Sequence, residues 1–369
     1  MLKVETIQDL ARLAALSEEW DRLDRALPLR LPFTSPLWAL EWWRAFRRDS
    51  FSASDQIHAY ALRDGSGALV ALAPTFVTSR PGRGPLRARE LQFFGADPYV
   101  TEWRGLICAP DREAEALAAL IAHMEREKPA DFIQWRGIPA GVPPDALGSG
   151  FQRQPNMGTT VHYLELPESW DALRASLPRN IKESLRKCYN SLARDGHAFS
   201  LNVAASPEAA PAALDVFFRL HAMRASAGET IGHPDVFADP RAKNFLRAYC
   251  DGLAQRGQLR IFELTIAGEI VASRIAFQFD DQIYMYFSGY DLAWGKYSVM
   301  TTTVAEAMKW SIANKLRIFN LSTGNDVSKT RWRPKNVEFF GGYTVAAAGL
   351  SRLAFAALHR LRMNRRAAT

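Results

Sequence analysis

Apolar residues recur every three or four positions near the start of the chain, at Leu10, Leu13, Leu16, Trp20 and Leu23. This spacing places them on one stripe of a helix, so the sequence predicts a helix from Leu2 to Arg25. Ser35 followed by Pro36 is typical of a helix start and predicts a second helix over residues 36–48.

The elements that follow form two similar series along the chain. In each series, antiparallel strands joined by tight turns lead into a helix and then another strand. A stretch rich in Gly and Pro at residues 137–150 lies near the boundary between the series. This order predicts an α/β (α+β) fold with two similar domains, residues 1–155 and 156–347, and a helical tail at residues 348–369.

The composition is that of an ordinary globular protein. The chain has 369 residues, of which 48% are hydrophobic and 23% are charged, and this excludes wholesale disorder and fibrous classes. The formal net charge is +7, but the tail from Ser351 onward carries five arginines and no acid. The body is therefore nearly neutral, and we expect no DNA partner.

Three cysteines, Cys108, Cys188 and Cys250, cannot all pair, and their spacing matches no zinc site. We expect reduced structural thiols, no metal and a cytoplasmic protein. The tail from Gly349 is basic and amphipathic, which leaves two alternatives open. Either it docks on the body with its arginines in water, or it touches the inner face of an anionic membrane.

A strand at residues 282–291 leads into the loop LAWGKY, and a helix begins at Ser298. Gly295 lets the backbone approach a ligand closely, Lys296 adds a positive charge, and the free N–H groups of the helix start favour an anion. This arrangement resembles the GNAT acyltransferase fold, in which the pyrophosphate of acyl-CoA lies on such a loop. The resemblance implies a cofactor site formed by Ser288, Gly289, Tyr290, Gly295, Lys296, Tyr297 and Ser298.

Further segments, in the expected order, extend the resemblance to nearly the whole chain: PFTSPLWALEWWRAF, LRKCYNSLARDG, FFRLHAMRA, GEIVASRIAFQFDDQIYMYFSGYD and STGNDVSKTRW. Together they resemble the cellulose-biosynthesis-associated (CelD-like) acetyltransferases, relatives of the Fem peptidyltransferases. The resemblance implies two tandem GNAT-like domains, each a mostly antiparallel mixed sheet flanked by helices. The second would hold acetyl-CoA or another acyl-CoA, and the first would be structural or face the acceptor.

Three side chains are candidates for proton transfer and charge stabilisation during amide formation. Asp326 and Lys329 follow a strand end, where reactive groups are commonly displayed, and would serve as base and as anion or oxyanion contact. The structural alternative is that Ser322 or Asn325 caps a short helix there and Asp326 complements its dipole. His221 is a second candidate base, with a packed core histidine as the alternative.

Four residues are candidates for substrate binding. Arg274 and Gln278 alternate with apolar residues and share a strand face, so they line a cleft or face solvent. Arg224 shares a helix face with His221 at a spacing of three. Tyr286 belongs to a set of strand tyrosines that pack in the core or line the acyl channel.

These observations favour an N-acyltransferase that moves an acyl group from acyl-CoA to a small-molecule or glycan-precursor amine, such as an amino sugar or an envelope polysaccharide precursor. One alternative is an aminoacyl-tRNA-dependent transferase of the Fem kind, with LRKCYNSLARDG as the contact. We do not expect tRNA, because the body is nearly neutral. A further alternative is a catalytically degenerate assembly factor for polysaccharide synthesis, because only Gly295 remains of the glycine-rich run common in GNAT loops.

Overall fold

The computed structural model describes residues 2–82, 87–148, 150–227 and 234–345. The chain divides into two compact units. Unit 1 comprises Met1–Thr159 and the segment that begins at Glu338, and unit 2 comprises Thr160–Val337. The predicted tail helix lies outside the described residues. Among the described residues, no helix is long and apolar enough to cross a membrane.

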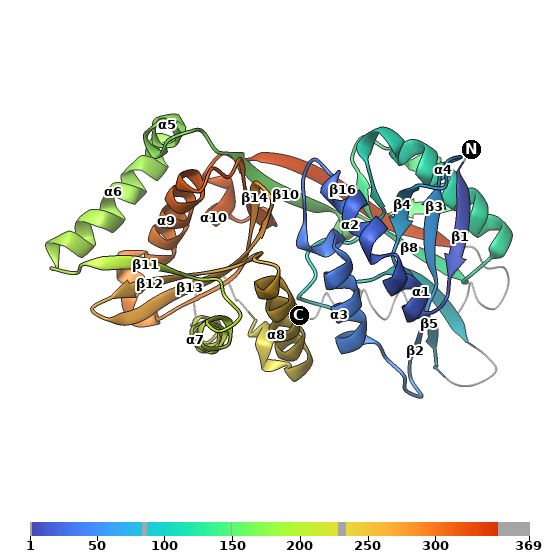
Figure 1. The fold of residues 1–369 in the computed structure, drawn as a ribbon, viewed down its shortest axis with the longest axis horizontal. Coiled ribbons are helices and arrows are strands. Elements are labelled where there is room, and N and C mark those ends of the chain that lie inside the picture. Colours follow the sequence, from blue (N-terminus) through green and yellow to red (C-terminus); the bar gives the residue numbers. More distant parts are fainter. Residues whose placement is uncertain (1, 83–86, 149, 228–233, 346–369) are drawn as a thin grey trace. The chain divides into compact units, whose positions relative to one another are not determined.

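Unit 1 contains two sheets with helices packed around them (Figure 1). Its strands are β1 (Lys3–Ile7), β2 (Ser54–Ile57), β3 (Ala59–Arg63), β4 (Leu69–Ala73), β5 (Thr75–Arg80), β6 (Ala88–Phe93), β7 (Ile107–Cys108), β8 (Phe132–Pro139), β9 (Phe151–Arg153) and β16 (Lys335–Val345). Its helices are α1 (Leu10–Ala15), α2 (Ser17–Arg25), α3 (Pro36–Phe46) and α4 (Glu113–Glu127), with 3₁₀ turns η1 (Pro32–Thr34), η2 (Pro110–Arg112), η3 (Pro144–Leu147) and η4 (Pro155–Met157).

The strand orders in unit 1 are β1-β3-β4-β7 and β2-β5-β6-β8-β16, with β9 also paired to β16. The prediction of one helix from Leu2 to Arg25 is wrong, because Lys3–Ile7 is a strand that pairs with β3. The Asp9 carboxylate then accepts a hydrogen bond from the backbone of Arg12 and starts α1. The segment NVEFFGGYTVA forms most of β16, which pairs with β8 and β9.

Unit 2 contains one sheet with the strand order β11-β12-β13-β14-β15-β10. Its strands are β10 (Thr159–Glu165), β11 (Phe199–Ala204), β12 (Leu259–Ile266), β13 (Glu269–Phe279), β14 (Gln282–Tyr290) and β15 (Ile318–Thr323). Its helices are α5 (Trp170–Ser176), α6 (Arg179–Arg194), α7 (Ala210–Ala225), α8 (Pro240–Gln255), α9 (Val299–Ala313) and α10 (Val327–Thr330), with 3₁₀ turns η5 (Val236–Ala238) and η6 (Leu292–Tyr297).

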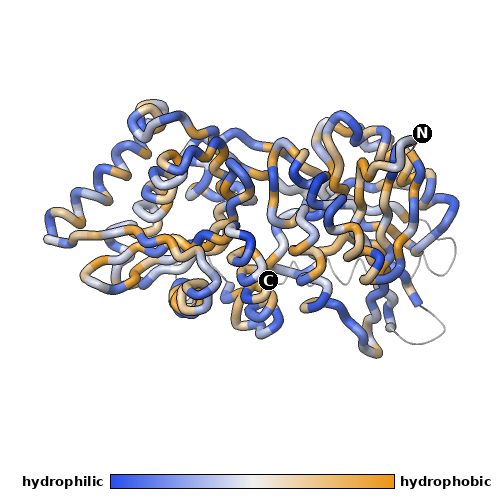
Figure 2. The backbone as a smooth tube through the Cα atoms, in the orientation of Figure 1, coloured by the Kyte–Doolittle hydropathy of each residue, from blue (hydrophilic) through white to orange (hydrophobic). Residues whose placement is uncertain are grey.

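The sheet of unit 2 carries helices on both faces, with α9 on one and α7 on the other (Figure 1). Phe262, Phe319 and Met308 belong to the core on the α9 side, and Leu185 of α6 packs into the same core. Figure 2 shows hydrophobic residues along the central strands and many hydrophilic residues along α6. The predicted fold class is confirmed, since mostly antiparallel sheets flanked by helices form both units.

Unit 1 depends on a buried ion pair between Asp24 and Arg30, which also receives a hydrogen bond from Thr34. Removing one member leaves the other charge buried, so Asp24→Ala should lower the free energy of unfolding by about 3–5 kcal/mol. Arg12→Ala, which removes an exposed pair with Glu5, should cost less than about 1 kcal/mol. Urea denaturation measures both, and equal losses would contradict the interpretation.

Candidate functional site

Two neighbouring strands of unit 2 part in the middle of the sheet. β14 and β15 pair in parallel only where Gln282–Tyr284 face Ile318–Asn320, although β14 continues to Tyr290. Backbone groups of β14 beyond this point therefore have no partner on β15. Asn320 lies at the fork, is only 1% exposed, and its Nδ2 atom has no hydrogen-bond acceptor among the described residues. A buried donor of this kind is a candidate contact for a ligand carbonyl.

A bulge in β14 lies just beyond the fork. The register against β13 shifts between Ala276, which faces Met285, and Arg274, which faces Ser288, so β14 carries an extra residue. Bulges of this kind bend a strand and change the direction of its side chains, and they are frequent beside active sites. Beyond the bulge, β14 stays paired with β13 as far as Tyr290 but no longer pairs with β15.

The end of β14 lies against α7 at Gly289. A Cβ atom on Gly289 would stand 2.3 Å from the backbone nitrogen of His221, so only glycine permits this contact. Two further contacts join the same elements: His221 Nδ1 lies 3.1 Å from the Ser288 carbonyl oxygen, and Arg224 donates to the Ser288 hydroxyl at 2.8 Å. The structure therefore brings four predicted site residues together.

His221 is buried and packed among the rings of Phe217, Phe237 and Phe287. Since a carbonyl oxygen can only accept, Nδ1 carries a proton and the neutral ring has its lone pair on Nε2. Burial lowers the pKa of His221, although its hydrogen bond to Ser288 and the charge of Asp235 oppose this. The ring is therefore neutral near neutral pH, with the unprotonated Nε2 buried.

The predicted loop LAWGKY is the 3₁₀ turn η6, which leads from β14 to α9. Gly295, Lys296 and Ser298 are exposed, and Ser298 adopts a left-handed conformation with φ of 54° at the N-terminus of α9. The hypothetical Cβ of Gly295 lies 3.7 Å from the Tyr290 ring, so these residues are neighbours. The Ser298 side chain makes no capping bond to α9. A helix start without a side-chain cap favours an anion.

Arg331 is a residue that sequence reasoning missed. It follows α10, donates to the Thr301 hydroxyl in the first turn of α9 at 2.8 Å, and has a buried Nε without a partner among the described residues. Burial lowers the pKa of Arg331. A cation at the positive end of a helix is unfavourable unless an anion joins it. The sequence shows Arg331 only as one arginine in KTRW, and a single arginine is too common to indicate a functional residue.

A cavity of about 490 Å³ lies between α6 and η6. Four cations and one acid lie among the residues of its lining. The lining consists of Glu183, Arg186, Lys187, Asn190, Ser191, Arg194, Lys296 and Tyr297. Tyr297 is buried and donates to the Asp195 carboxylate at 2.9 Å, which fixes the loop against the end of α6. The cavity therefore places positive charge beside the loop that the sequence predicts to bind an anion.

Asp326 and Lys329 form a local ion pair. Lys329 Nζ lies 3.1 Å from the Asp326 carboxylate and also donates to the Thr323 carbonyl, while Ser328 donates to Asp326. Burial raises the pKa of Asp326, but the hydrogen bond from Ser328 and the charge of Lys329 outweigh it, and the pKa is lowered. A carboxylate with a lowered pKa is a weak base, so this geometry favours a role in holding the loop.

The remaining predicted residues lie at different places in the sheet. Arg274 is half-buried and stands opposite Ser288 in the register of β13 and β14. Gln278 lies at the far end of β13 and donates to the Asp280 carbonyl, so it is not near the loop. Tyr286 is buried against the rings of Phe277 and Phe287, as in the core alternative.

Comparison with known families identifies the domain around this site. Residues 179–332 match the family model described as "Acetyltransferase (GNAT) domain". This segment is therefore similar to a GNAT-type domain. It contains α6, the parted strands, η6, α9 and Arg331, which are the features described above. The CelD-like branch stays a prediction, and a search of curated proteins finds no match.

Three solved structures resemble nearly the whole chain. The crystal structure of FemX is 11% identical and has a TM-score of 0.61, covering 91% of this chain and 96% of that chain. The C-terminal domain of a putative lysylphosphatidylglycerol synthetase from Agrobacterium fabrum is 10% identical, with a TM-score of 0.51 and coverage of 94% and 95%. A tandem GNAT protein from the clavulanic acid biosynthesis pathway is 11% identical, with a TM-score of 0.48 and coverage of 94% and 100%. At such identities the first two show a shared fold alone.

Gly289→Ala should separate β14 from α7, because the new methyl group meets the backbone of His221. We expect a loss of about 1–3 kcal/mol in the free energy of unfolding. Gly295→Ala is the matched control, since its methyl group would meet only the Tyr290 ring at an ordinary distance of 3.7 Å. A thermal or urea unfolding curve that is unchanged for Gly289→Ala would refute the close contact.

Burial of His221 links stability to pH. Its pKa in the folded protein is below the ordinary value of 6.5, so protonation favours the unfolded chain. The contribution of neutral His221 to the free energy of unfolding is present above pH 6.5 and is lost as the pH falls below it. The loss is about 1.4 kcal/mol for each unit by which the pKa differs between the folded and unfolded chain. Urea unfolding measures the free energy of unfolding at pH 7.5 and at pH 5.5. Between these two values, His221→Gln should lose less free energy of unfolding than the wild type. An identical loss would show that His221 is not buried in the neutral form.

Proposed function

We propose that unit 2 is an N-acyltransferase domain that takes acyl-CoA, most simply acetyl-CoA, as donor. The observation that carries the proposal is the parting of β14 and β15 beside the exposed loop at Gly295–Ser298. A fork in a sheet leaves backbone donors and acceptors unpaired, and these suit the amide groups of an extended pantetheine arm. The match of residues 179–332 to a GNAT domain model supports the same donor.

The charges around η6 suit the phosphate groups of such a donor. Lys296 and the cations of α6 line the cavity of about 490 Å³, and Arg331 lies at the start of α9. Arginine and lysine bind phosphate through charge-assisted hydrogen bonds, and the helix start adds backbone donors. The acyl carbonyl would then lie toward the fork, where Asn320 Nδ2 is available as a donor.

His221 suits the proton transfer that amide formation requires. The amine nitrogen attacks the thioester carbon, and the C–S bond breaks with its electron pair leaving on the CoA thiolate. One proton leaves the nitrogen, so that the product is a neutral amide. Nε2 of the neutral His221 ring accepts that proton, while the Ser288 carbonyl holds the ring through Nδ1. We propose His221 as base in preference to Asp326, whose pKa is lowered by Ser328 and Lys329. Positioning of both substrates supplies much of the remaining acceleration.

The acceptor that we propose is an amine on a small molecule or glycan precursor, such as an amino sugar in the synthesis of an envelope polysaccharide. A second candidate donor is aminoacyl-tRNA, which the exposed cations Arg186 and Lys187 on α6 favour. The two donors differ in their response to salt, because a long polyanion releases many counterions and binds with a steep salt dependence. The proposal of a degenerate assembly factor requires that no donor binds.

Isothermal titration with acetyl-CoA tests the donor. We expect saturable binding that Lys296→Gln and Arg331→Met each weaken by about 10- to 150-fold, because each removes a charge-assisted hydrogen bond worth about 1.5–3 kcal/mol. Arg317→Gln is the control, since Arg317 is exposed and pairs with Asp281. Absence of binding to acetyl-CoA and longer acyl-CoAs by folded protein would refute the proposal. Tight, salt-sensitive binding of aminoacyl-tRNA would then favour the second donor.

A further inference from the structure

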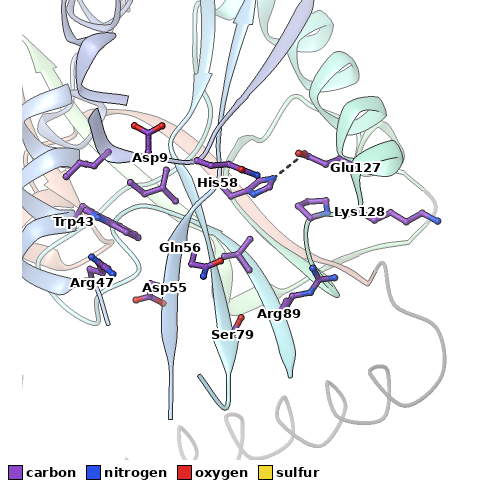
Figure 3. Close-up of a pocket in the computed structure, with 15 residues that line it drawn as sticks. Asp9, Trp43, Arg47, Asp55, Gln56, His58, Ser79, Arg89, Glu127 and Lys128 are labelled. Atoms are coloured by element: carbon purple, nitrogen blue, oxygen red, sulfur yellow. Dashed lines mark ion pairs between the residues drawn. The ribbon is translucent and has the colours of Figure 1, made fainter. Parts of the chain in front are cut away.

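Unit 1 contains a larger cavity that the proposed function does not use. Its volume is about 710 Å³, and its walls come from the ends of β1, α3 and α4 and from β2, β5 and β6 (Figure 3). All of these elements belong to unit 1, so the cavity is independent of the loop and fork of unit 2. A cavity of this size accommodates a small organic ligand.

A histidine held by a carboxylate forms one wall of this cavity. Glu127 at the end of α4 accepts hydrogen bonds from Thr6 at 3.1 Å and from the Tyr60 hydroxyl at 3.0 Å. His58 Nε2 lies 3.2 Å from the same carboxylate, and its side chain is 13% exposed toward the cavity (Figure 3). The Glu127 carboxylate faces Nε2, which is buried and makes no hydrogen bond among the described residues, so Nδ1 is the ring nitrogen left for a ligand.

The other acids that line the cavity are engaged by the protein itself. Asp55 is buried and accepts two hydrogen bonds from the Arg48 guanidinium, each at 2.9 Å, and another from Thr78. Asp9 accepts from the backbone of Arg12 and caps α1. The charge of Asp55 is therefore balanced by Arg48, whereas Asp9 is exposed and keeps its charge.

Two arginines of the lining are held much more loosely. Arg47 lies 3.7 Å from Asp49, and Arg89 lies 3.9 Å from Asp131, so both ion pairs are long. About half of each arginine side chain is exposed. Figure 3 shows them on opposite walls, with Gln56 between them. Such guanidinium groups retain donors for an anion. The cavity therefore combines available cations with an oriented imidazole.

We propose that this cavity is a second binding site, for a small anion that carries hydroxyl groups, such as a sugar phosphate. Arg89 and Arg47 bind the anionic group, and Nδ1 of His58 accepts a hydrogen bond from a ligand hydroxyl while Glu127 holds Nε2. The two kinds of contact make different demands, so an anion without hydroxyl groups binds more weakly than one that carries them.

Isothermal titration with glucose 1-phosphate, inorganic phosphate and methyl glucoside tests this site in the full chain. We expect saturable binding of glucose 1-phosphate, weaker binding of phosphate and the weakest binding of methyl glucoside. Arg89→Gln should weaken both phosphate compounds about tenfold. His58→Phe should weaken glucose 1-phosphate more than inorganic phosphate, because it removes the contact to the sugar hydroxyl.

Arg112→Gln is the matched control, since Arg112 pairs with Glu115 and does not line the cavity. Binding of acetyl-CoA should be unchanged in Arg89→Gln and His58→Phe, which separates this site from the donor site of unit 2. Absence of any binding by folded protein at about 10 mM probe would overturn the proposal. Equal binding by wild type and Arg89→Gln would also overturn it, because the anion would then bind elsewhere.

Discussion

The parting of β14 from β15 is the constraint on which the site depends. A parallel pair normally continues its hydrogen bonds as far as both strands extend, but this pair stops after Tyr284 and Asn320. Two features keep the strands apart: the bulge against β13, and the contact of Gly289 with the backbone of α7. The unpaired backbone is costly in a closed core, and a ligand that lies between the strands removes that cost.

The sequence predicted the order of elements in unit 2 and the turn between β14 and α9, because both depend on local patterns. The sequence did not predict β1, because the helix inferred from the apolar stripe at Leu10 was extended back to Leu2. The strand at Lys3–Ile7 pairs with β3, which lies far along the chain and is not visible in the local pattern. The sequence also missed Arg331 and the orphan amide of Asn320. Their importance comes from tertiary neighbours, Thr301 for the first and the fork for the second, and one sequence does not show these.

The two units differ in how their charges are arranged. In unit 2, cations gather around η6 and the start of α9, where a helix dipole adds to them. In unit 1, a carboxylate orients His58, and arginines stand on separate walls of the cavity. A polyphosphate donor suits the first arrangement, and a smaller, hydroxylated anion suits the second. The two units therefore present different candidate sites, because a site depends on side chains rather than on the fold.

The most direct test of the central claim is a crystal structure of the protein with acetyl-CoA bound. Our account predicts that the pantetheine arm lies between β14 and β15, with its amide groups bonded to the backbone of β14 beyond Met285. The phosphates should lie against Lys296, Arg331 and the start of α9. A structure in which β14 and β15 close into a continuous pair, or in which acetyl-CoA binds away from η6, would contradict the account.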